Sequence, residues 1–196
     1  MEVFKNKFSI CLEKKAEFKK QKPFVIWLTG ISCSGKSSVA NCLEKTFFAF
    51  GKHVVVLDGD NLRAGLNSDL GFSREDRKEN IRRIAEVAKL FFENGDIVIV
   101  SAISPYAEDR LNARMLFDGN SFYEVLLDVS IETAINRDKK GLYKKALEGK
   151  LDAFPGINME YQMHDKSILL LNTNFKKPQE ISEIIIKNIP ELVDIK

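Results

Sequence analysis

The sequence predicts an α/β fold in which a parallel sheet of about five strands is flanked by helices on both faces. Two features of the chain support this prediction. Five short apolar runs alternate with segments of helical periodicity, which is typical of strand–helix–strand crossovers in a parallel sheet. The first of these runs leads into Gly30-x-x-x-x-Gly35-Lys36-Ser37, which has the spacing of a phosphate-binding loop, or P-loop.

Length and composition set the domain organisation and exclude some partners. The 196 residues are expected to form an N-terminal extension, 1–22, and one domain, 23–196. The formal net charge of +2 leaves no basic excess for a nucleic-acid partner. No apolar run approaches the roughly 20 residues that span a membrane, so a membrane partner is not expected either. Three cysteines without metal-ligand spacing favour a cytoplasmic location, although residence in an organelle is left open.

The N-terminal extension carries apolar residues at helical spacing among lysines. Phe4, Phe8, Cys11 and Leu12 would share one face of a short helix. Such a helix would pack on the domain or on a second subunit. A partly ordered tail is the alternative.

The P-loop has the flanking elements that its motif requires. An apolar run, 24–28, predicts a buried strand before the loop, and an apolar stripe predicts a helix after it. Backbone N–H groups in such a loop form an anion site, to which the helix N-terminus adds partial positive charge. Lys36 is placed to reach the β- and γ-phosphates of a nucleoside triphosphate, and Ser37 is placed to ligate Mg²⁺.

Two carboxylates follow the second predicted strand, 53–57. Asp58 and Asp60 stand where an α/β sheet places its ligand crevice, at the carboxyl end of a strand. One could hold Mg²⁺, and one could accept the proton of an incoming hydroxyl. The alternative is a solvated Asp-Gly turn, which is common, but the nearby P-loop favours the functional interpretation.

A short turn or helix is expected over 61–66, and a long helix over 74–93. Ser73 is a predicted N-cap for the long helix, with Asp76 three residues later. Arg77 and Asn80 lie on one side near its start, where arginine suits a phosphate or sulfate group. The periodicity alone favours the alternative, a charged surface face with weak ion pairs.

The remaining elements complete a P-loop kinase-type fold with a mobile lid. Strands are predicted over 96–101, 122–128 and 167–172, and helices over 107–117, 131–137 and 179–188. The stretch of about 138–158 is basic and punctuated by glycines. We interpret it as a lid that closes over two substrates and excludes water. A solvated basic loop is the alternative.

Five strings of residues, in order, resemble the adenylylsulfate (APS) kinase family from Phe24 to Pro190. They are Leu57-Asp-Gly-Asp-Asn-Leu-Arg63, Leu70-Gly-Phe-Ser73, Asp76-Arg-Lys-Glu-Asn-Ile-Arg-Arg83, Ile103-Ser-Pro105 and Lys140-Gly-Leu-Tyr143. The resemblance implies an enzyme of sulfate activation and assimilation that uses ATP with Mg²⁺. Such an enzyme transfers the γ-phosphoryl group to the 3′-hydroxyl of APS, giving 3′-phosphoadenylylsulfate (PAPS) and ADP. It also implies a homodimer.

The resemblance assigns a role to each matching position. The catalytic set would be Lys36, Asp58, Asp60 and Ser104, and the metal set Ser37, Asp58 and Asp60. Asp60 would be the best candidate for the base or for the Mg²⁺ site. ATP would be bound by Gly30, Ile31, Ser32, Cys33, Ser34, Gly35, Lys36, Ser37, Ser38 and, at its base, Arg137. APS would be bound by Asp60, Arg63, Phe72, Arg77, Asn80, Ile103, Ser104, Lys140 and Phe154. Phe72 and Phe154 would clamp the adenine, while Arg77 and Asn80 would bind the phosphosulfate and ribose side.

Ser104 corresponds to a serine that is described, in the family that the sequence resembles, as forming a phosphoserine intermediate. Direct in-line transfer needs only positioning and charge stabilisation. A positional role near the acceptor is therefore the simpler interpretation.

Four positions depart from the family pattern. Cys33 stands where glycine is usual, and a positive φ there would cost on the order of 1 kcal/mol or more. A thiol in an anion site could also have a lowered pKa, so we hypothesise that oxidation of Cys33 blocks ATP binding. Pro155, Asn158 and Gln162 replace a usual threonine, aspartate and glutamate in and after the distal lid.

Two alternatives to an APS kinase are left open, the first of them by the departures in the lid. One is a 3′-kinase of another nucleotide with a sulfate-like 5′ group, such as a cytidine diphosphoramidate. The other is an inactive P-loop protein that binds a nucleotide and serves as a partner module. Intact Lys36, Ser37, Asp58 and Asp60 argue against the inactive protein.

Overall fold

A five-stranded parallel sheet forms the centre of the protein. The computed structural model describes residues 4, 6, 8–163 and 169–189. The strands, which pair in the order β2-β3-β1-β4-β5, are β1 (Val25–Thr29), β2 (Val54–Asp58), β3 (Ile97–Ser101), β4 (Phe122–Asp128) and β5 (Leu169–Asn172). All four pairings are parallel, as predicted. The predicted fifth strand began at Ser167, which lies outside the described residues.

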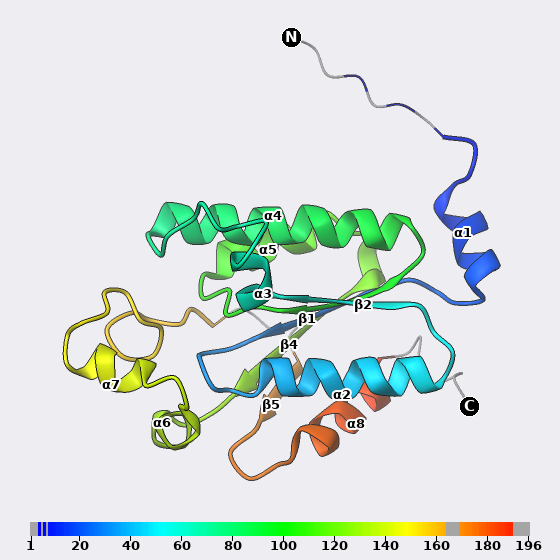
Figure 1. The fold of residues 1–196 in the computed structure, drawn as a ribbon. Helices are drawn as coiled ribbons and strands as arrows, with labels where there is room; N and C mark the ends of the chain where they lie inside the picture. Colours follow the sequence, from blue (N-terminus) through cyan, green and yellow to red (C-terminus); the bar gives the residue numbers. More distant parts are fainter. Residues whose placement is uncertain (1–3, 5, 7, 164–168, 190–196) are drawn as a thin grey trace.

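Helices cover both faces of the sheet (Figure 1). On one face lie α2 (Lys36–Ala49) and α8 (Pro178–Asn188), and on the other lie α4 (Arg74–Glu93) and α5 (Ala107–Arg114). Each face has its own apolar cluster, because side chains of β1 and β3 alternate between the two layers. Both strands are buried along their whole length, which explains their continuous apolar sequence.

Local signals set the starts of two helices, of which the sequence predicted the first. Ser73 caps α4, since its hydroxyl accepts a hydrogen bond from the Asp76 N–H at 3.1 Å. Asp58 caps the short helix α3 (Gly59–Arg63) in the same way. The Asp58 carboxylate, one of the two expected in the site, therefore also fixes the shape of the turn from Asp58 to Asp60.

The predicted lid projects beyond the carboxyl ends of the strands (Figure 1). It follows α6 (Ile131–Arg137) and contains a helix that the sequence did not predict, α7 (Leu142–Leu147). A 3₁₀ turn, η1 (Gly119–Ser121), precedes β4. The lid has a small apolar cluster of its own, centred on Tyr143, Ala146 and Phe154.

The N-terminal extension lies at the opposite end of the sheet from the lid (Figure 1). Its helix α1 spans Leu12–Lys19 and is held by an ion pair of 2.5 Å between Lys19 Nζ and Asp96 Oδ1. The prediction of a helix that includes Phe4 and Phe8 is wrong. Both side chains are at least 80% exposed and precede the helix, so they have nothing to pack against. Within the described residues, no helix has the length and apolar character needed to cross a membrane.

Candidate active site

The polar residues singled out in the sequence meet at the carboxyl ends of neighbouring strands. The P-loop follows β1, Asp58 ends β2, and Ser101 ends β3, which lies between β1 and β2 in the sheet. Parallel strands therefore deliver an anion site, a carboxylate and a hydroxyl to one edge.

The backbone of the P-loop needs glycine at its first position. Gly30 has a φ of +139°, and a Cβ there would lie 2.5 Å from the carbonyl oxygen of Leu127. Gly35 has a φ of +98° and precedes the first residue of α2. Cys33, where the family has glycine, also has a positive φ of +62°. The expected backbone strain is therefore present at Cys33.

Lys36 folds back over the P-loop. Its Nζ donates to the carbonyl oxygens of Gly30 at 2.9 Å and Ile31 at 2.7 Å. Burial lowers the pKa of Lys36 to about 8, because the charged ammonium loses hydration that two carbonyls only partly replace. The ammonium therefore lies against the backbone of the P-loop.

This pKa predicts a pH dependence of nucleotide binding. As pH rises through about 8, Lys36 loses its proton in the nucleotide-free protein, while a bound phosphate favours the charged ammonium. Affinity for ADP should fall above pH 8, and binding at pH 8.5 should take up more than half a proton. Calorimetry in two buffers of different ionisation enthalpy measures this uptake. Lys36→Arg should abolish it, and uptake that is unchanged in this variant would contradict the assignment.

Asp58 joins the P-loop to the sheet edge. Its Oδ2 accepts hydrogen bonds from Ser37 Oγ at 2.6 Å and Ser101 Oγ at 3.0 Å, and its Oδ1 accepts one from the Asp60 N–H at 3.0 Å. Sequence analysis missed Ser101. The available signal was a polar residue at the end of an otherwise apolar strand.

The oxygens around Asp58 fit a magnesium ion that also binds phosphate. Among the described residues, no three His, Cys, Asp or Glu side chains form a metal cluster. Mg²⁺ at a nucleotide commonly takes only one or two protein oxygens, with phosphates and water completing its shell. Ser37 Oγ and an Asp58 carboxylate oxygen, 2.6 Å apart, are hard ligands of this kind.

Asp60 is paired with the lid. Its Oδ2 accepts a hydrogen bond from Lys140 Nζ at 2.6 Å, and both side chains are largely exposed. The bond to this carboxylate raises the pKa of Lys140. The pair brings two residues of the expected acceptor site together across 80 positions of sequence.

The two phenylalanines expected to clamp a base differ in exposure. Phe72 is 61% exposed, with the guanidinium carbon of Arg63 4.5 Å from its ring centre. Phe154 is only 8% exposed and packs edge to face on Tyr143 at 5.0 Å. Arg77 links the two segments, since it donates to the carbonyl oxygens of Phe72 at 3.0 Å and Ala153 at 2.8 Å.

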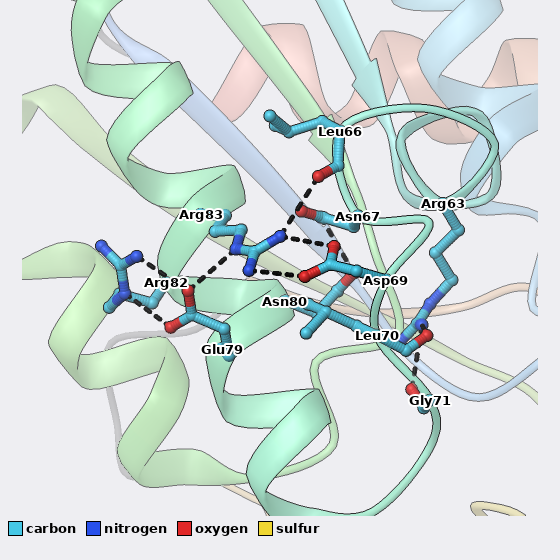
Figure 2. Close-up of polar contacts among 10 residues, drawn as sticks. All are labelled: Arg63, Leu66, Asn67, Asp69, Leu70, Gly71, Glu79, Asn80, Arg82 and Arg83. Atoms are coloured by element: carbon cyan, nitrogen blue, oxygen red, sulfur yellow. Dashed lines mark hydrogen bonds and ion pairs between the residues drawn. The ribbon is translucent and has the colours of Figure 1, made fainter.

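Polar contacts hold the loop 64–73 against α4 (Figure 2). Arg83 pairs with Asp69 through two hydrogen bonds of 2.7 and 2.9 Å. Asn67 Nδ2 donates to Asn80 Oδ1 at 3.1 Å, and both side chains are buried. Arg63 donates to the carbonyl oxygens of Leu70 and Gly71, so the loop has a fixed shape beside Phe72. Sequence analysis gave no role to Asp69, Asn67 or Arg83.

Ser104 is buried, with 1% of its surface exposed and a φ of +40°. Its Oγ accepts a hydrogen bond from Trp27 Nε1 at 3.1 Å and lies 2.8 Å from Thr29 Oγ1 and 3.3 Å from the carbonyl oxygen of Ala102. Ile103 is half-buried, and its carbonyl oxygen accepts from the Thr29 hydroxyl at 2.7 Å. Both residues brace the start of the P-loop.

The lid also contacts the P-loop directly. Tyr143 donates its hydroxyl hydrogen to the carbonyl oxygen of Ser32 at 2.8 Å, and Ile31 and Cys33 pack against the lid cluster. Burial there raises the pKa of the Cys33 thiol, so the expectation of a lowered pKa is wrong. Arg137, at the root of the lid, donates to the carbonyl oxygen of Thr173 at 2.6 Å.

The lid departures have structural roles. Asn158 Oδ1 accepts from the Phe154 N–H at 2.5 Å, and Nδ2 donates to the Leu151 carbonyl oxygen at 2.8 Å, a bond that aspartate could not donate. Gln162 Oε1 accepts from the Ala107 N–H at 3.2 Å, at the start of α5, which a glutamate could also do. Pro155 forms an isolated bridge with Met159.

The sheet order, the P-loop lysine and serine, the carboxylates beside them and the lid define a P-loop kinase. Residues 22–172 match the family model described as adenylylsulphate kinase. The chain belongs to this family, as the resemblance in its sequence indicated.

Known relatives are similar in sequence to this protein over most of its length. It is 47% identical to an adenylyl-sulfate kinase of Bacillus licheniformis over 183 residues, which cover 93% of each protein. It is 47% identical to the bifunctional enzyme NodQ of a Rhizobium species over 87% of this chain, which spans 26% of that enzyme. A solved structure of the Mycobacterium tuberculosis APS kinase CysC with AMPPNP and APS is 42% identical, with a TM-score of 0.79 over 85% of this chain and 97% of that one.

Proposed function

We propose that this protein transfers the γ-phosphoryl group of ATP to the 3′-hydroxyl of APS, giving PAPS, ADP and a proton. The observation that carries the proposal is the convergence of Lys36, Ser37, Asp58 and Asp60 at one sheet edge beside the APS kinase sequence strings. Membership of the family supports the choice of APS as acceptor.

The P-loop side binds and activates the donor. Residues 30–38 would surround the β- and γ-phosphates with backbone N–H groups, and Lys36 would leave its carbonyl partners to stabilise charge that spreads over the transferring group. Bound Mg²⁺, held by Ser37 and Asp58, would neutralise phosphate charge. Arg137, fixed by its bond to Thr173, would lie against the base of ATP.

The opposite side prepares the acceptor. A secondary hydroxyl is a weak nucleophile at neutral pH, so a carboxylate must lie within hydrogen-bond reach of its proton. We assign this role to Asp60, which would exchange Lys140 for the 3′-hydroxyl as APS binds. Lys140 would then be available to the substrate, and Arg63 and Phe72 would line the same pocket.

The adenine clamp requires a movement of the lid. Phe72 is open, but Phe154 is enclosed by Tyr143. Because Arg77 bonds the backbone beside both phenylalanines, it would keep their segments in register while the Phe154 ring turns toward the base. Arg77 and Asn80 would thereby position the phosphosulfate and ribose side.

Replacing Phe72 by alanine should weaken APS binding by about 1–3 kcal/mol, because a base loses its stacking surface. The affinity for ADP should not change. Isothermal calorimetry with each nucleotide measures both. Phe48→Ala is a matched control, since Phe48 is 77% exposed on the far end of α2. Equal APS affinity in the wild type and the Phe72 variant would remove Phe72 from the clamp.

Incubation with Mg-ATP and separate acceptor nucleotides tests the proposed function. APS should be converted to PAPS in step with ADP formation, as measured by chromatography and mass spectrometry. Preferred phosphorylation of a cytidine diphosphoramidate would show that this nucleotide, and not APS, is the acceptor substrate. Binding of ADP and APS without turnover would identify an inactive nucleotide-binding protein.

We also propose a homodimer and a cytoplasmic location. The family resemblance supports the dimer, which light scattering would detect as twice the chain mass of 22.3 kDa. The three cysteines are free thiols, which supports a reducing compartment.

A further inference from the structure

Three hydrogen-bonding groups converge on the hydroxyl of Thr29, the residue immediately before the P-loop. Its Oγ1 lies 2.7 Å from the Ile103 carbonyl oxygen, 2.8 Å from Ser104 Oγ and 2.5 Å from the hydroxyl of Tyr161. Thr29 and Ser104 are buried. Tyr161 lies shortly after the end of the lid, so this cluster joins the segment that leaves the lid to the start of the P-loop.

The carbonyl oxygen of Ile103 sets the direction of the hydrogen bond between Thr29 and Tyr161. Ile103 O can only accept, so Thr29 donates its one hydroxyl hydrogen there. Thr29 Oγ1 then accepts from Tyr161, while Ser104 Oγ accepts from the Trp27 N–H and has both Thr29 Oγ1 and the Ala102 carbonyl oxygen within reach of its one hydrogen. Burial raises the pKa of Tyr161 to about 12, which keeps its hydroxyl a donor across the working pH range. Every hydroxyl hydrogen of the cluster thus has an acceptor within reach.

A buried ion pair also holds the two segments that contain Ser104 and Tyr161. Arg110 on α5 is fully buried, and its Nε donates to Glu124 Oε1 of β4 at 2.6 Å. Its other two nitrogens donate to the carbonyl oxygens of Ser104 and Gln162, each at 2.7 Å. A buried ion pair is tolerated only with its hydrogen bonds satisfied, so this guanidinium keeps both segments where they are.

We propose that Thr29, Tyr161 and Arg110 form a fixed hinge at which the trailing end of the lid is attached to the P-loop, and that they are positioning residues for phosphoryl transfer. The inference rests on the proposed function. Each time the lid closes, its cations must reach the same positions beside the substrates. A misplacement of about 1 Å can cost about a hundredfold in rate. Because these residues bond the two segments together, the position of the P-loop determines where the trailing end of the lid lies.

Tyr161→Phe tests the hinge with the smallest change, because the ring and its packing beside Arg110 remain. The kcat for APS phosphorylation should fall at least tenfold, while the Kd for ADP stays within twofold. Hydrogen exchange of backbone amides in 138–160 should become faster. Thr29→Val breaks the same bond and also removes the contacts with Ile103 and Ser104, so its loss should be at least as large. The double variant should be little worse than Thr29→Val alone, because that variant has already lost the bond to Tyr161.

Two controls separate positioning from general damage. Tyr106→Phe removes a hydroxyl whose one acceptor among the described residues is the Met159 sulfur, a weak acceptor, at 3.6 Å, and should leave kcat within twofold. Phe92→Leu, in the core near α1, should lower the melting temperature without changing kcat at 25 °C. A Tyr161→Phe enzyme with wild-type kcat and lid exchange would overturn the hinge. Absence of PAPS formation by the wild type would overturn the proposed function instead, and lid exchange would still report on the hinge.

Discussion

Replacing Asp60 by asparagine should lower kcat for APS phosphorylation at least about a hundredfold, the size expected when a general base is removed. The amide keeps the shape of the side chain and can still accept a hydrogen bond, but it cannot take the proton of the 3′-hydroxyl. Initial rates at saturating ATP and APS measure the effect.

Two further variants separate the base from its ion pair with the lid. Lys140→Met removes the partner at 2.6 Å without removing the carboxylate, so its effect should appear mainly in the KM for APS. Asp152→Asn changes an exposed lid carboxylate and should leave the rate within twofold. An Asp60→Asn enzyme with near-normal kcat would exclude Asp60 from proton transfer.

Replacing Lys36 by methionine should lower kcat/KM for ATP about a thousandfold. The variant loses both ground-state binding of the terminal phosphates and stabilisation of the charge that develops on them, and loss of one such donor typically costs about 10²–10³ in rate. Steady-state kinetics with varied ATP measure the loss.

The matched control is Lys45→Met, an exposed position on the same helix. It should leave kcat/KM unchanged. Lys36→Met should remain folded, because its apolar side chain fits a site whose burial already lowers the pKa of the lysine to about 8. A folded Lys36→Met enzyme with more than a tenth of wild-type kcat/KM would contradict the role of Lys36.

The sequence predicted the sheet and the succession of strand, P-loop and helix because both depend on contiguous patterns. Five apolar runs became five parallel strands, and the P-loop spacing put Lys36 and Ser37 at the start of the helix that follows β1. The Ser73 cap is likewise a local signal, and the structure confirms it. The prediction of a helix from the spacing of Phe4 and Phe8 was wrong, since a short periodic segment forms no stable helix without a packing surface.

The features that could not be predicted depend on contacts between distant positions. Thr29 and Tyr161 are separated by 132 residues, and neither stands in a recognisable motif. The pKa of Cys33 is raised because lid residues bury a thiol that the P-loop pattern alone would leave in an anion site. Helix α7 forms in a basic stretch because Tyr143 and Ala146 pack into the lid cluster with Ile31.

The stereochemistry of a single turnover tests most directly that the phosphoryl group passes straight from ATP in the P-loop to APS beside Asp60. ATP that is chiral at the γ-phosphorus through oxygen isotopes should give PAPS labelled on the 3′-phosphate with inverted configuration. Retained configuration would require a phosphorylated enzyme, and would contradict direct transfer past a buried Ser104. Label on any other atom of the acceptor would contradict the proposed reaction itself.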